Sequence, residues 1–437
     1  MSDFQTPGDQ TPRIETLEFV VTDPNGRARG KWGPAASLAK ARGAGINFPL
    51  SLHGLDVWGT EVPQTGLHIS SGDRDGFFRA VEGTLTPVPG RPGSAQILLE
   101  TFTPEGEPFG GCSRQVLRRA VGRLSADGLS ATVAFEVEFH LLDPQGNVSE
   151  AHAMGDTQQM YALDRLADHD AVLDAVREAG SAAGIPIDTI VKEAAPGQYE
   201  INLTHRPDAL RAADDVVLLR RIADAAARAA GLRASFMAKP FAEEAGNGMH
   251  VHCSLVDRDG RNIFENDETR LEHAAAALVA RMPETALVFL NTWNGFRRIA
   301  PGSYAPCNAN WGRNNRSVAV RVPASPPAAR RLEHRIAGAD ANPYLVLAVI
   351  LEGMREGLRE RRPPPRPVEG NAYDETTPNR GVPLSPRMTE ALELYGRSEH
   401  ARDALGVELF SLLRHLKRAE VDRFERRIEP FERGTYL

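Results

Sequence analysis

The stretch ATVAFEVEFHLL at Ala131–Leu142 has the alternating pattern of a half-buried β-strand. One face of the predicted strand is apolar and consists of Val133, Phe135, Val137, Phe139 and Leu141. The opposite face carries Glu136, Glu138 and His140. Side chains two positions apart on a strand point the same way, roughly 7 Å apart. We therefore expect one face to be buried and the other to present carboxylates and an imidazole.

Three further stretches share this design, each with polar side chains opposite an apolar face. The polar positions are Glu200 and Asn202 in YEINL (Tyr199–Leu203), His250, His252 and Ser254 in MHVHCSL (Met249–Leu255), and Arg331, Glu333 and Arg335 in RLEHRI (residues 331–336). One charged residue in an apolar strand carries little information. Four such strands indicate a single polar cavity built on a sheet.

The bulk composition is that of an ordinary globular protein, with 437 residues of which 25% are charged and 41% hydrophobic. This length exceeds what one small core can organise, and it predicts two or more domains. The formal net charge is −7, and the sequence contains no dense run of Lys and Arg. Both observations argue against a nucleic-acid partner.

The expected location is the cytoplasm. Cys112, Cys253 and Cys307 are scattered and form no CxxC motif, which favours a reducing compartment. The N-terminal sequence MSDFQTPGDQTPR is polar and lacks the apolar core of a signal peptide. No apolar run of about 18 residues is available to span a membrane, so no membrane partner is expected.

The chain divides by pattern into three parts. Residues 1–13 are expected to form a disordered lead-in, residues 14–110 a small strand-rich domain, and residues 111–437 a larger domain of strands and helices. The predicted strands of the small domain are LEFVVTD (17–23), VEGTLTPV (81–88) and AQILLET (95–101), and the predicted helices of the larger one are Asp208–Gly231, Asn342–Arg359 and a tail from Pro386 to Glu429. Helices around a mostly antiparallel sheet, without a GxGxxG nucleotide loop, predict an α+β fold.

Six side chains on or beside these strands are candidate metal ligands: Glu136, Glu138, Glu193, Glu200, His250 and Glu333. Crowded carboxylates without cations repel one another, and metal ions remove that conflict. Oxygen-rich ligands with one imidazole favour Mg²⁺ or Mn²⁺ over zinc. The set suits two ions flanking a transferring phosphoryl group. The alternative is that these are solvated glutamates on half-exposed strands.

Arginines crowd the region that follows, namely Arg297, Arg298, Arg316, Arg321, Arg330, Arg331 and Arg335. Planar guanidinium groups match the geometry of carboxylate and phosphate, although some of these arginines are expected only to pair with surface acids. The Gly- and Pro-containing segment Asn291–Pro323 predicts a shaped loop bordering the cavity. Metal ligands, anion clamps and a loop together predict phosphoryl transfer onto a carboxylate.

Six ordered motifs resemble the glutamine synthetase family over nearly the full length of the chain. They are FEVEF, KEAAPGQYEINL, GNGMHVHCSL, FRRIAPGSYAP with WGRNNRSVAVRVP, RRLEHR and DANPYL. The resemblance implies an N-terminal β-grasp domain and a catalytic domain with a curved antiparallel sheet and surrounding helices. It also implies a homo-oligomer, commonly a dodecamer of two stacked hexamers whose active sites are shared between neighbours.

The resemblance also assigns roles to residues. Glu138, Glu193 and Glu200 match the ligands of a first metal, and Glu136, His250 and Glu333 those of a second, among two or three Mg²⁺ or Mn²⁺ ions per site. Arg298, Arg316, Arg321 and Arg335 match arginines that hold the acid substrate and the phosphoryl group, Gly246 a loop glycine that contacts the amino acid, and His252, Ser254 and Arg331 the ATP side. The family transfers the γ-phosphoryl of ATP to glutamate, and an amine then displaces phosphate.

The sequence departs from the family at the amine side. Tyr304 replaces a glutamate that ammonia-using members place there, and a neutral phenol cannot attract a cation by full charge. Ala245 replaces an asparagine that contacts glutamate, and Tyr161 matches a tyrosine of the ammonium site. The sequence therefore resembles most closely the γ-glutamyl-amine ligases of the γ-glutamylpolyamine synthetase type, with polyamines, ethanolamine, alkylamines and anilines as candidate amines. A true glutamine synthetase and a catalytically silent member are the alternatives.

Overall fold

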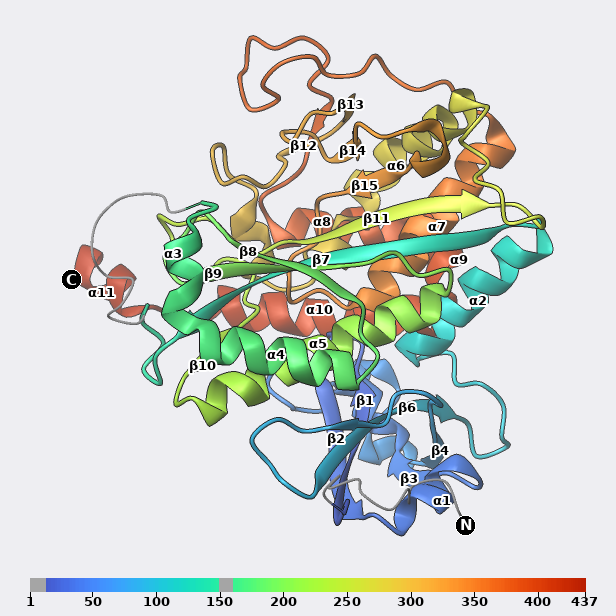
Figure 1. Ribbon diagram of the computed structural model, residues 1–437, viewed down its shortest axis with the longest axis vertical. Helices are drawn as coiled ribbons and strands as arrows, with labels where there is room; N and C mark the ends of the chain where they lie inside the picture. Colours follow the sequence, from blue (N-terminus) through green and yellow to red (C-terminus); the bar gives the residue numbers. More distant parts are fainter. Residues whose placement is uncertain (1–12, 149–159) are drawn as a thin grey trace.

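The computed structural model describes residues 13–148 and 160–437. The lead-in expected at residues 1–13 lies outside the described residues except for Arg13. Figure 1 shows the N-terminal sheet as a blue layer at one end of the molecule, below a larger sheet that is surrounded by helices. This arrangement is an α+β fold, as predicted.

The N-terminal sheet has the strand order β2-β1-β6-β4-β3, with β5 paired to β6. Its elements are β1 Thr16–Thr22, β2 Ala28–Pro34, α1 Ser37–Arg42, β3 Ile46–Pro49, β4 Asp75–Ala80, β5 Thr86–Pro87 and β6 Ser94–Phe102. The predicted strands LEFVVTD and AQILLET are confirmed as β1 and β6, which pair in parallel. The expectation of a strand over VEGTLTPV is wrong. Gly83 turns the chain with a left-handed backbone conformation (φ 77), and only Thr86–Pro87 form a strand.

The larger sheet has the order β13-β14-β15-β11-β7-β9-β8, with β10 on β7. Its strands are β7 Ser130–Leu142, β8 Ile187–Lys192, β9 Gln198–Leu203, β10 Arg233–Ser235, β11 Met249–Val256, β13 Trp311–Arg313, β14 Val320–Val322 and β15 Leu332–His334. The four stretches with polar faces are the adjacent strands β15, β11, β7 and β9, each antiparallel to its neighbour. Only β13 and β14 pair in parallel in the described sheet. The prediction of one polar surface is confirmed.

The α-helices that follow the N-terminal sheet in the described chain are α2 Ser113–Ala126, α3 Leu163–Leu166, α4 Asp170–Ala182, α5 Ala209–Ala229, α6 Glu268–Phe289, α7 Pro343–Glu360, α8 Met388–Arg397, α9 Glu399–Leu405, α10 Val407–Glu425 and α11 Pro430–Tyr436. Helices α5 and α7 are confirmed, and the side chains of Asp208 and Asn342 cap their N-termini. The tail expected from Pro386 to Glu429 divides into α8, α9 and α10, because Ser398 caps a new helix and Gly406 (φ 77) ends it.

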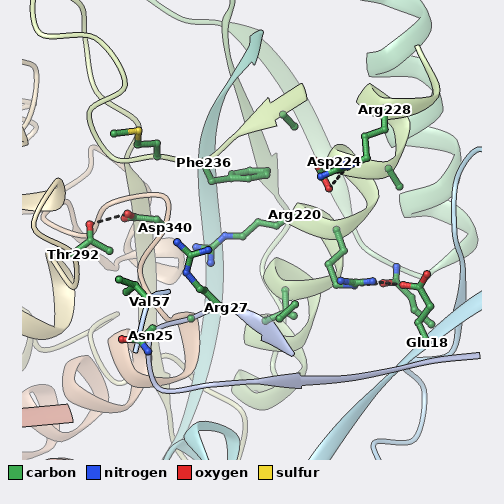
Figure 2. A pocket seen from close by; sticks show the side chains of 18 of the residues that line it. Glu18, Asn25, Arg27, Val57, Arg220, Asp224, Arg228, Phe236, Thr292 and Asp340 are labelled. Carbon is green, nitrogen blue, oxygen red and sulfur yellow. Dashed lines mark hydrogen bonds and ion pairs between the residues drawn. The ribbon is translucent and has the colours of Figure 1, made fainter. Parts of the chain in front are cut away.

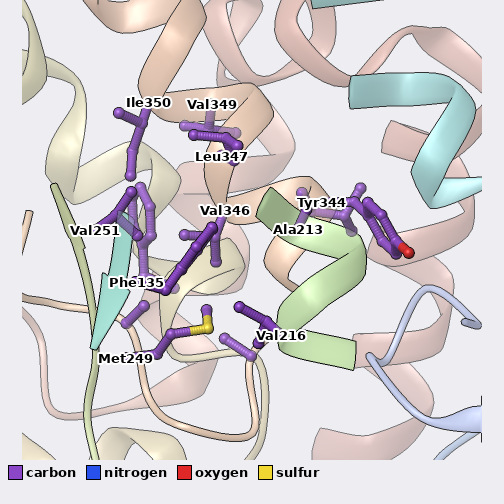
Figure 3. Close-up of a cluster of buried hydrophobic side chains, with 14 of the residues drawn as sticks. Phe135, Ala213, Val216, Met249, Val251, Tyr344, Val346, Leu347, Val349 and Ile350 are labelled. Carbon is purple, nitrogen blue, oxygen red and sulfur yellow. The ribbon is translucent and has the colours of Figure 1, made fainter. Parts of the chain in front are cut away.

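The apolar face of the larger sheet packs on α5 and α7. Figure 3 shows Phe135 of β7 and Met249 of β11 beside Val216 of α5 and Val346 of α7. All four side chains are fully buried. Burial of a side chain as large as Phe135 stabilises the fold by roughly 1.5–3 kcal/mol. Because the helices occupy this face, the carboxylates and imidazoles of the same strands must point the other way.

Candidate active site

A cavity of about 490 Å³ lies over the polar face of the sheet. The predicted site residues that line it are Glu136, Glu138, Tyr161, Glu193, Glu200, Gly246, His250, Arg298, Tyr304, Arg316 and Arg335. Of the other predicted residues, Arg321, Glu333, His252 and Ser254 lie on the strands of the same sheet, and Arg331 directly precedes β15. The cavity thus joins groups that are far apart in the sequence.

Strand register brings the acidic groups together in pairs. Glu136 lies opposite His250 across β7 and β11, and Glu138 lies opposite Glu200 across β7 and β9. Like charges directly opposite each other destabilise a sheet, so the second pair indicates a site that is built for a cation. Asn202 donates a hydrogen bond to Glu200 Oε1 at 3.0 Å and fixes that carboxylate.

Two clusters of ligand atoms have the dimensions of a cation site. Glu136, Glu200 and His250 offer atoms within 4.8 Å of one another, as do Glu136, His252 and Glu333. Carboxylate oxygens dominate both clusters, and this donor set fits a divalent cation of the Mg²⁺ or Mn²⁺ type. Glu136 belongs to both clusters, so the geometry mixes the two predicted ligand sets. The assignment of each ligand to one ion therefore stays a prediction.

The protonation of the carboxylates follows their surroundings. Burial and the nearby Glu138 raise the pKa of Glu193 to about 7. Burial, together with the charges of Glu136 and Glu138, raises the pKa of Glu200 well above its usual range. Burial opposes ionisation of Glu136 as well, but hydrogen bonds from His250 and His252 hold its pKa below the usual value. Without a cation, Glu193 and Glu200 are therefore the carboxyl groups of this cluster that most readily hold a proton.

The arginines divide into those that face the cavity and those that support the fold. Arg298 is only 3% exposed, and its Nη1 donates to the carbonyl of Ile336 at 2.8 Å. Arg335 donates to Glu333 Oε1, and Arg321 Nη1 donates to Glu333 Oε2 at 2.7 Å. Despite burial, Arg335 and the neighbouring histidines lower the pKa of Glu333 to about 2. Glu333 therefore carries a full negative charge.

Two other predicted arginines differ in their surroundings. Arg316 lines the cavity, is exposed, and makes no ion pair with the described residues. Arg330 instead donates to the carbonyls of Phe264 and Glu265, the second at 2.7 Å, and holds the chain between β11 and α6. Arg316 is thus available to a bound anion, whereas Arg330 has a structural role.

Gly246 stands where the chain passes close to Arg298. A Cβ at this position would lie 2.4 Å from the carbonyl oxygen of Ala238 and 3.0 Å from Arg298 Cγ. The carbonyl of Gly246 accepts a hydrogen bond from Gln198 at 3.1 Å, and Gln198 also reaches Glu138 at 3.3 Å. Sequence reasoning missed Gln198, although it alternates with Glu200 on β9 and so shares its face.

The predicted ATP side follows β11 away from the cavity. Arg331 Nε donates to His252 Nδ1 at 3.1 Å, and His252 Nε2 lies 2.9 Å from Glu136 Oε1. Because Nδ1 accepts, Nε2 carries the proton and donates to the carboxylate. The ring of His205, which sequence reasoning also missed, lies 6.3 Å from that of His252. Ser254 follows on the same face and is buried.

Two tyrosines border the cavity in an unusual backbone conformation. Tyr161 has φ 63 and Tyr304 has φ 60, and their exposed fractions are 61% and 50%. The left-handed region is uncommon for bulky residues and costs of order 1–3 kcal/mol. Such strain persists where the surrounding structure imposes it, and this is frequent at ligand sites. Because both residues line the cavity and are at least half exposed, we place them at its mouth.

A larger cavity of about 1050 Å³ lies between the N-terminal sheet and α5. Figure 2 shows two of its acidic groups paired with neighbours: Asp224 accepts from Arg228, and Asp340 accepts from Thr292. Glu18 accepts from both Arg91 and Arg221. Neither of the two candidate cation clusters found among the described residues borders this cavity. The chemistry therefore belongs to the smaller cavity on the sheet.

Comparison with known proteins agrees with this geometry. The family model of the glutamine synthetase catalytic domain matches residues 110–436. The chain is 37% identical to gamma-glutamylputrescine synthetase PuuA of Escherichia coli (strain K12), covering 97% of this chain and 92% of that protein. It is 32% identical to the glutamate–isopropylamine ligase of Pseudomonas sp, covering 97% and 95%. A solved structure described as a GmaS/ADP complex superimposes with a TM-score of 0.86 at 27% identity, covering 97% of each chain.

The fold and the site define a ligase that works with ATP and a divalent metal. The chain belongs to the glutamine synthetase family. Its relatives PuuA and the isopropylamine ligase are named for organic amines. Within the described residues, no helix has both the length and the apolar character that a membrane crossing requires.

Proposed function

We propose that this chain is an ATP-dependent ligase that joins glutamate to an organic amine through a γ-glutamyl phosphate. The observation that carries the proposal is the cavity itself, in which metal-ligand carboxylates and arginines converge while Tyr304 occupies the mouth. The relatives named for putrescine and isopropylamine support an organic amine over ammonia. Because Tyr304 is neutral and half-exposed, it offers a ring to an alkyl chain and no charge to ammonium.

We propose two Mg²⁺ or Mn²⁺ ions, with Glu138, Glu193 and Glu200 at one and Glu136, His250 and Glu333 at the other. Bound ions of this type would neutralise charge on the transferring phosphoryl group. Two features support the assignment: Glu138 lies opposite Glu200 in the sheet, and the pKa values of Glu193 and Glu200 are raised.

The residues of the chain would then perform the remaining tasks. Arg298 and Arg335 are buried and held in place by Ile336 and Glu333, so they are suited to orient the carboxylates of glutamate. Arg316 is exposed at the cavity and is suited to the phosphoryl group. Fixed donors of this kind stabilise developing negative charge without reorganisation at the moment of reaction. We place ATP beside His252, Ser254 and Arg331.

The test is ADP release and product mass with glutamate, ATP, Mn²⁺ and a panel of amines. The panel contains putrescine, isopropylamine, ethanolamine, aniline and ammonia. We expect a γ-glutamyl amide from at least one organic amine at a higher kcat/KM than from ammonia. Glu138→Gln keeps the shape of the side chain but removes a ligand charge, and it should abolish turnover with every amine. Ammonia outperforming every organic amine would overturn the proposal.

We further propose that the chain acts in the cytoplasm as a ring-shaped homo-oligomer, a dodecamer of two stacked hexamers with shared active sites. Family membership supports this assembly. Light scattering coupled to size-exclusion chromatography gives the mass directly. A monomer that is fully active at assay concentration would exclude sites shared between subunits.

A further inference from the structure

Tyr373 is a cavity residue to which the preceding assignments give no role. It lies between α7 and α8 and lines the same cavity as Arg298, Tyr304 and Arg335. Its hydroxyl oxygen is buried and has no hydrogen-bond partner among the described residues. Buried hydroxyl groups nearly always have a partner, so this exception calls for a physical explanation.

The backbone around Tyr373 is firmly fixed. The amide of Ala372 donates to Ser317 Oγ at 2.9 Å, and the amide of Tyr373 donates to Asn371 Oδ1 at 3.0 Å. Ala372 also packs in a small buried cluster with Val318 and Val368. These contacts fix the backbone that carries the Tyr373 side chain.

The same segment is joined to the loop that carries Tyr304. Strand β12 (Asn308–Ala309) pairs with β16 (Val382–Pro383), and Leu384 N donates to the carbonyl of Cys307 at 2.8 Å. Asn310 reaches the carbonyl of Arg380 at 2.7 Å. Tyr373 thus lies on a segment that is held against both the arginines and the amine-side loop.

Three buried donors at this end of the site lack a partner in the described part of the chain. They are the Tyr373 hydroxyl, Arg298 Nε and Arg335 Nε. All three residues line the same cavity. Donors without acceptors that converge beside positive charge indicate an anionic ligand.

The hydroxyl is a donor and not a base. Burial raises the pKa of Tyr373 to about 12, with a further contribution from Cys307, so the phenol keeps its proton at neutral pH. A neutral phenol cannot take the proton of an attacking amine as a carboxylate would. Its O–H can still donate to a carboxylate oxygen held by arginines, and such a charge-assisted bond is stronger than a neutral one.

We propose that Tyr373 is a substrate-binding residue whose hydroxyl donates a hydrogen bond to a carboxylate oxygen of the acid substrate, beside Arg298 and Arg335. This inference rests on the proposed function and names a further contact within that site. It predicts that the hydroxyl contributes to binding of the acid, and to binding of neither ATP nor the amine.

Tyr373→Phe tests this contact, because it removes the hydroxyl alone. We expect the KM for glutamate to rise roughly 10- to 30-fold, as for loss of a hydrogen bond to a charged group, with KM values for ATP and amine unchanged. Without substrate the Tm should not fall, because the hydroxyl makes no bond within the described protein. The matched control is Tyr395→Phe, which removes a hydroxyl that donates to the carbonyl of Phe410 at 3.2 Å. That variant should lower Tm and leave every KM unchanged.

Glutamate binding to the Mn²⁺-loaded protein, followed by calorimetry, provides a second readout that does not need turnover. Weaker binding to Tyr373→Phe supports the contact. An active wild type with an unchanged glutamate KM in the variant overturns this inference and leaves the proposed function intact. A fall in Tm together with equal changes in all KM values shows a structural role and also overturns it. No glutamate binding by the wild type overturns both.

Discussion

Binding of a divalent metal should release protons from the carboxylate cluster. Burial and Glu138 raise the pKa of Glu193 to about 7, and burial with neighbouring carboxylates raises that of Glu200 well above its usual range. A metal ion binds the ionised carboxylate, so it must displace the protons that these groups hold. At pH 7 a group with a pKa of about 7 is about half protonated. Glu193 alone should therefore release about half a proton, and Glu200 should add to this.

Isothermal titration calorimetry measures this release directly. Mn²⁺ is titrated into metal-free protein in buffers of different ionisation enthalpy, and the slope of the observed enthalpy gives the number of protons. The release should decrease from pH 6 to pH 8, where Glu193 retains only about a tenth of a proton. Glu193→Gln, which has nearly the same shape, should lose its own share and bind more weakly. A slope of zero at pH 7 would refute the account of the cluster.

The raised pKa values of Glu193 and Glu200 also make the free energy of unfolding depend on pH. Their folded-state pKa values are raised above the value of 4.5 for a free glutamate side chain. Between about pH 4.5 and 7 the folded protein therefore holds protons that the unfolded chain has released, so the metal-free protein loses stability as pH rises through this window. Metal removes the unfavourable repulsion, and its stabilising effect on Tm should grow with pH. A metal effect that shrinks as pH rises from 5 to 7 would contradict this sign.

Three further predictions concern single residues. Tyr304→Glu should shift the ratio of kcat/KM for ammonia to kcat/KM for an organic amine towards ammonia by about tenfold or more, because the added carboxylate attracts ammonium and can accept its proton. An unchanged amine profile would show that this position does not set specificity. Gly246→Ala places a Cβ 2.4 Å from the carbonyl oxygen of Ala238, so both Tm and glutamate affinity should fall, whereas wild-type values would contradict this close approach. Burial lowers the pKa of His53 to about 3, so stability should fall below about pH 6.5, where the unfolded histidine takes up a proton. In His53→Gln, the free energy of unfolding should fall less steeply as pH drops from 6.5 to 5, by up to about 1.4 kcal/mol per pH unit. An unaltered pH dependence in Tm or denaturant measurements would argue against this account.

The strands and the polar face that carries the candidate ligands were predictable because strand alternation is a local signal. In β7 each apolar residue from Val133 to Leu141 is buried, and the polar residues between them face the other way. This pattern needs only the period of two that any strand has. Register was not visible in the sequence. That Glu138 stands opposite Glu200, and Glu136 opposite His250, depends on pairing between distant segments.

Tyr373, in contrast to Gln198 on β9, lies where no periodic pattern exists. Tyr373 follows Asn371 in an irregular segment, and only its backbone bonds to Asn371 and the packing of Ala372 aim the ring at the cavity. A tyrosine in such a segment has the same local sequence whether it faces solvent or substrate. The prediction of a strand over VEGTLTPV was wrong for a related reason: one left-handed glycine, Gly83, outweighed the strand propensity of its neighbours.

The two halves of the proposed reaction rest on parts of the fold with different tolerance to change. The strands that carry the proposed metal ligands are held on their other face by buried side chains such as Phe135, which is 0% exposed. Truncation of Phe135 to Ala would cost roughly 3–5 kcal/mol. Tyr304 is 50% exposed on a loop, so a substitution there costs the fold little. Amine specificity can therefore change at the loop while the phosphoryl chemistry stays fixed. On this reasoning, Tyr304→Glu should alter the choice of nitrogen without altering metal affinity.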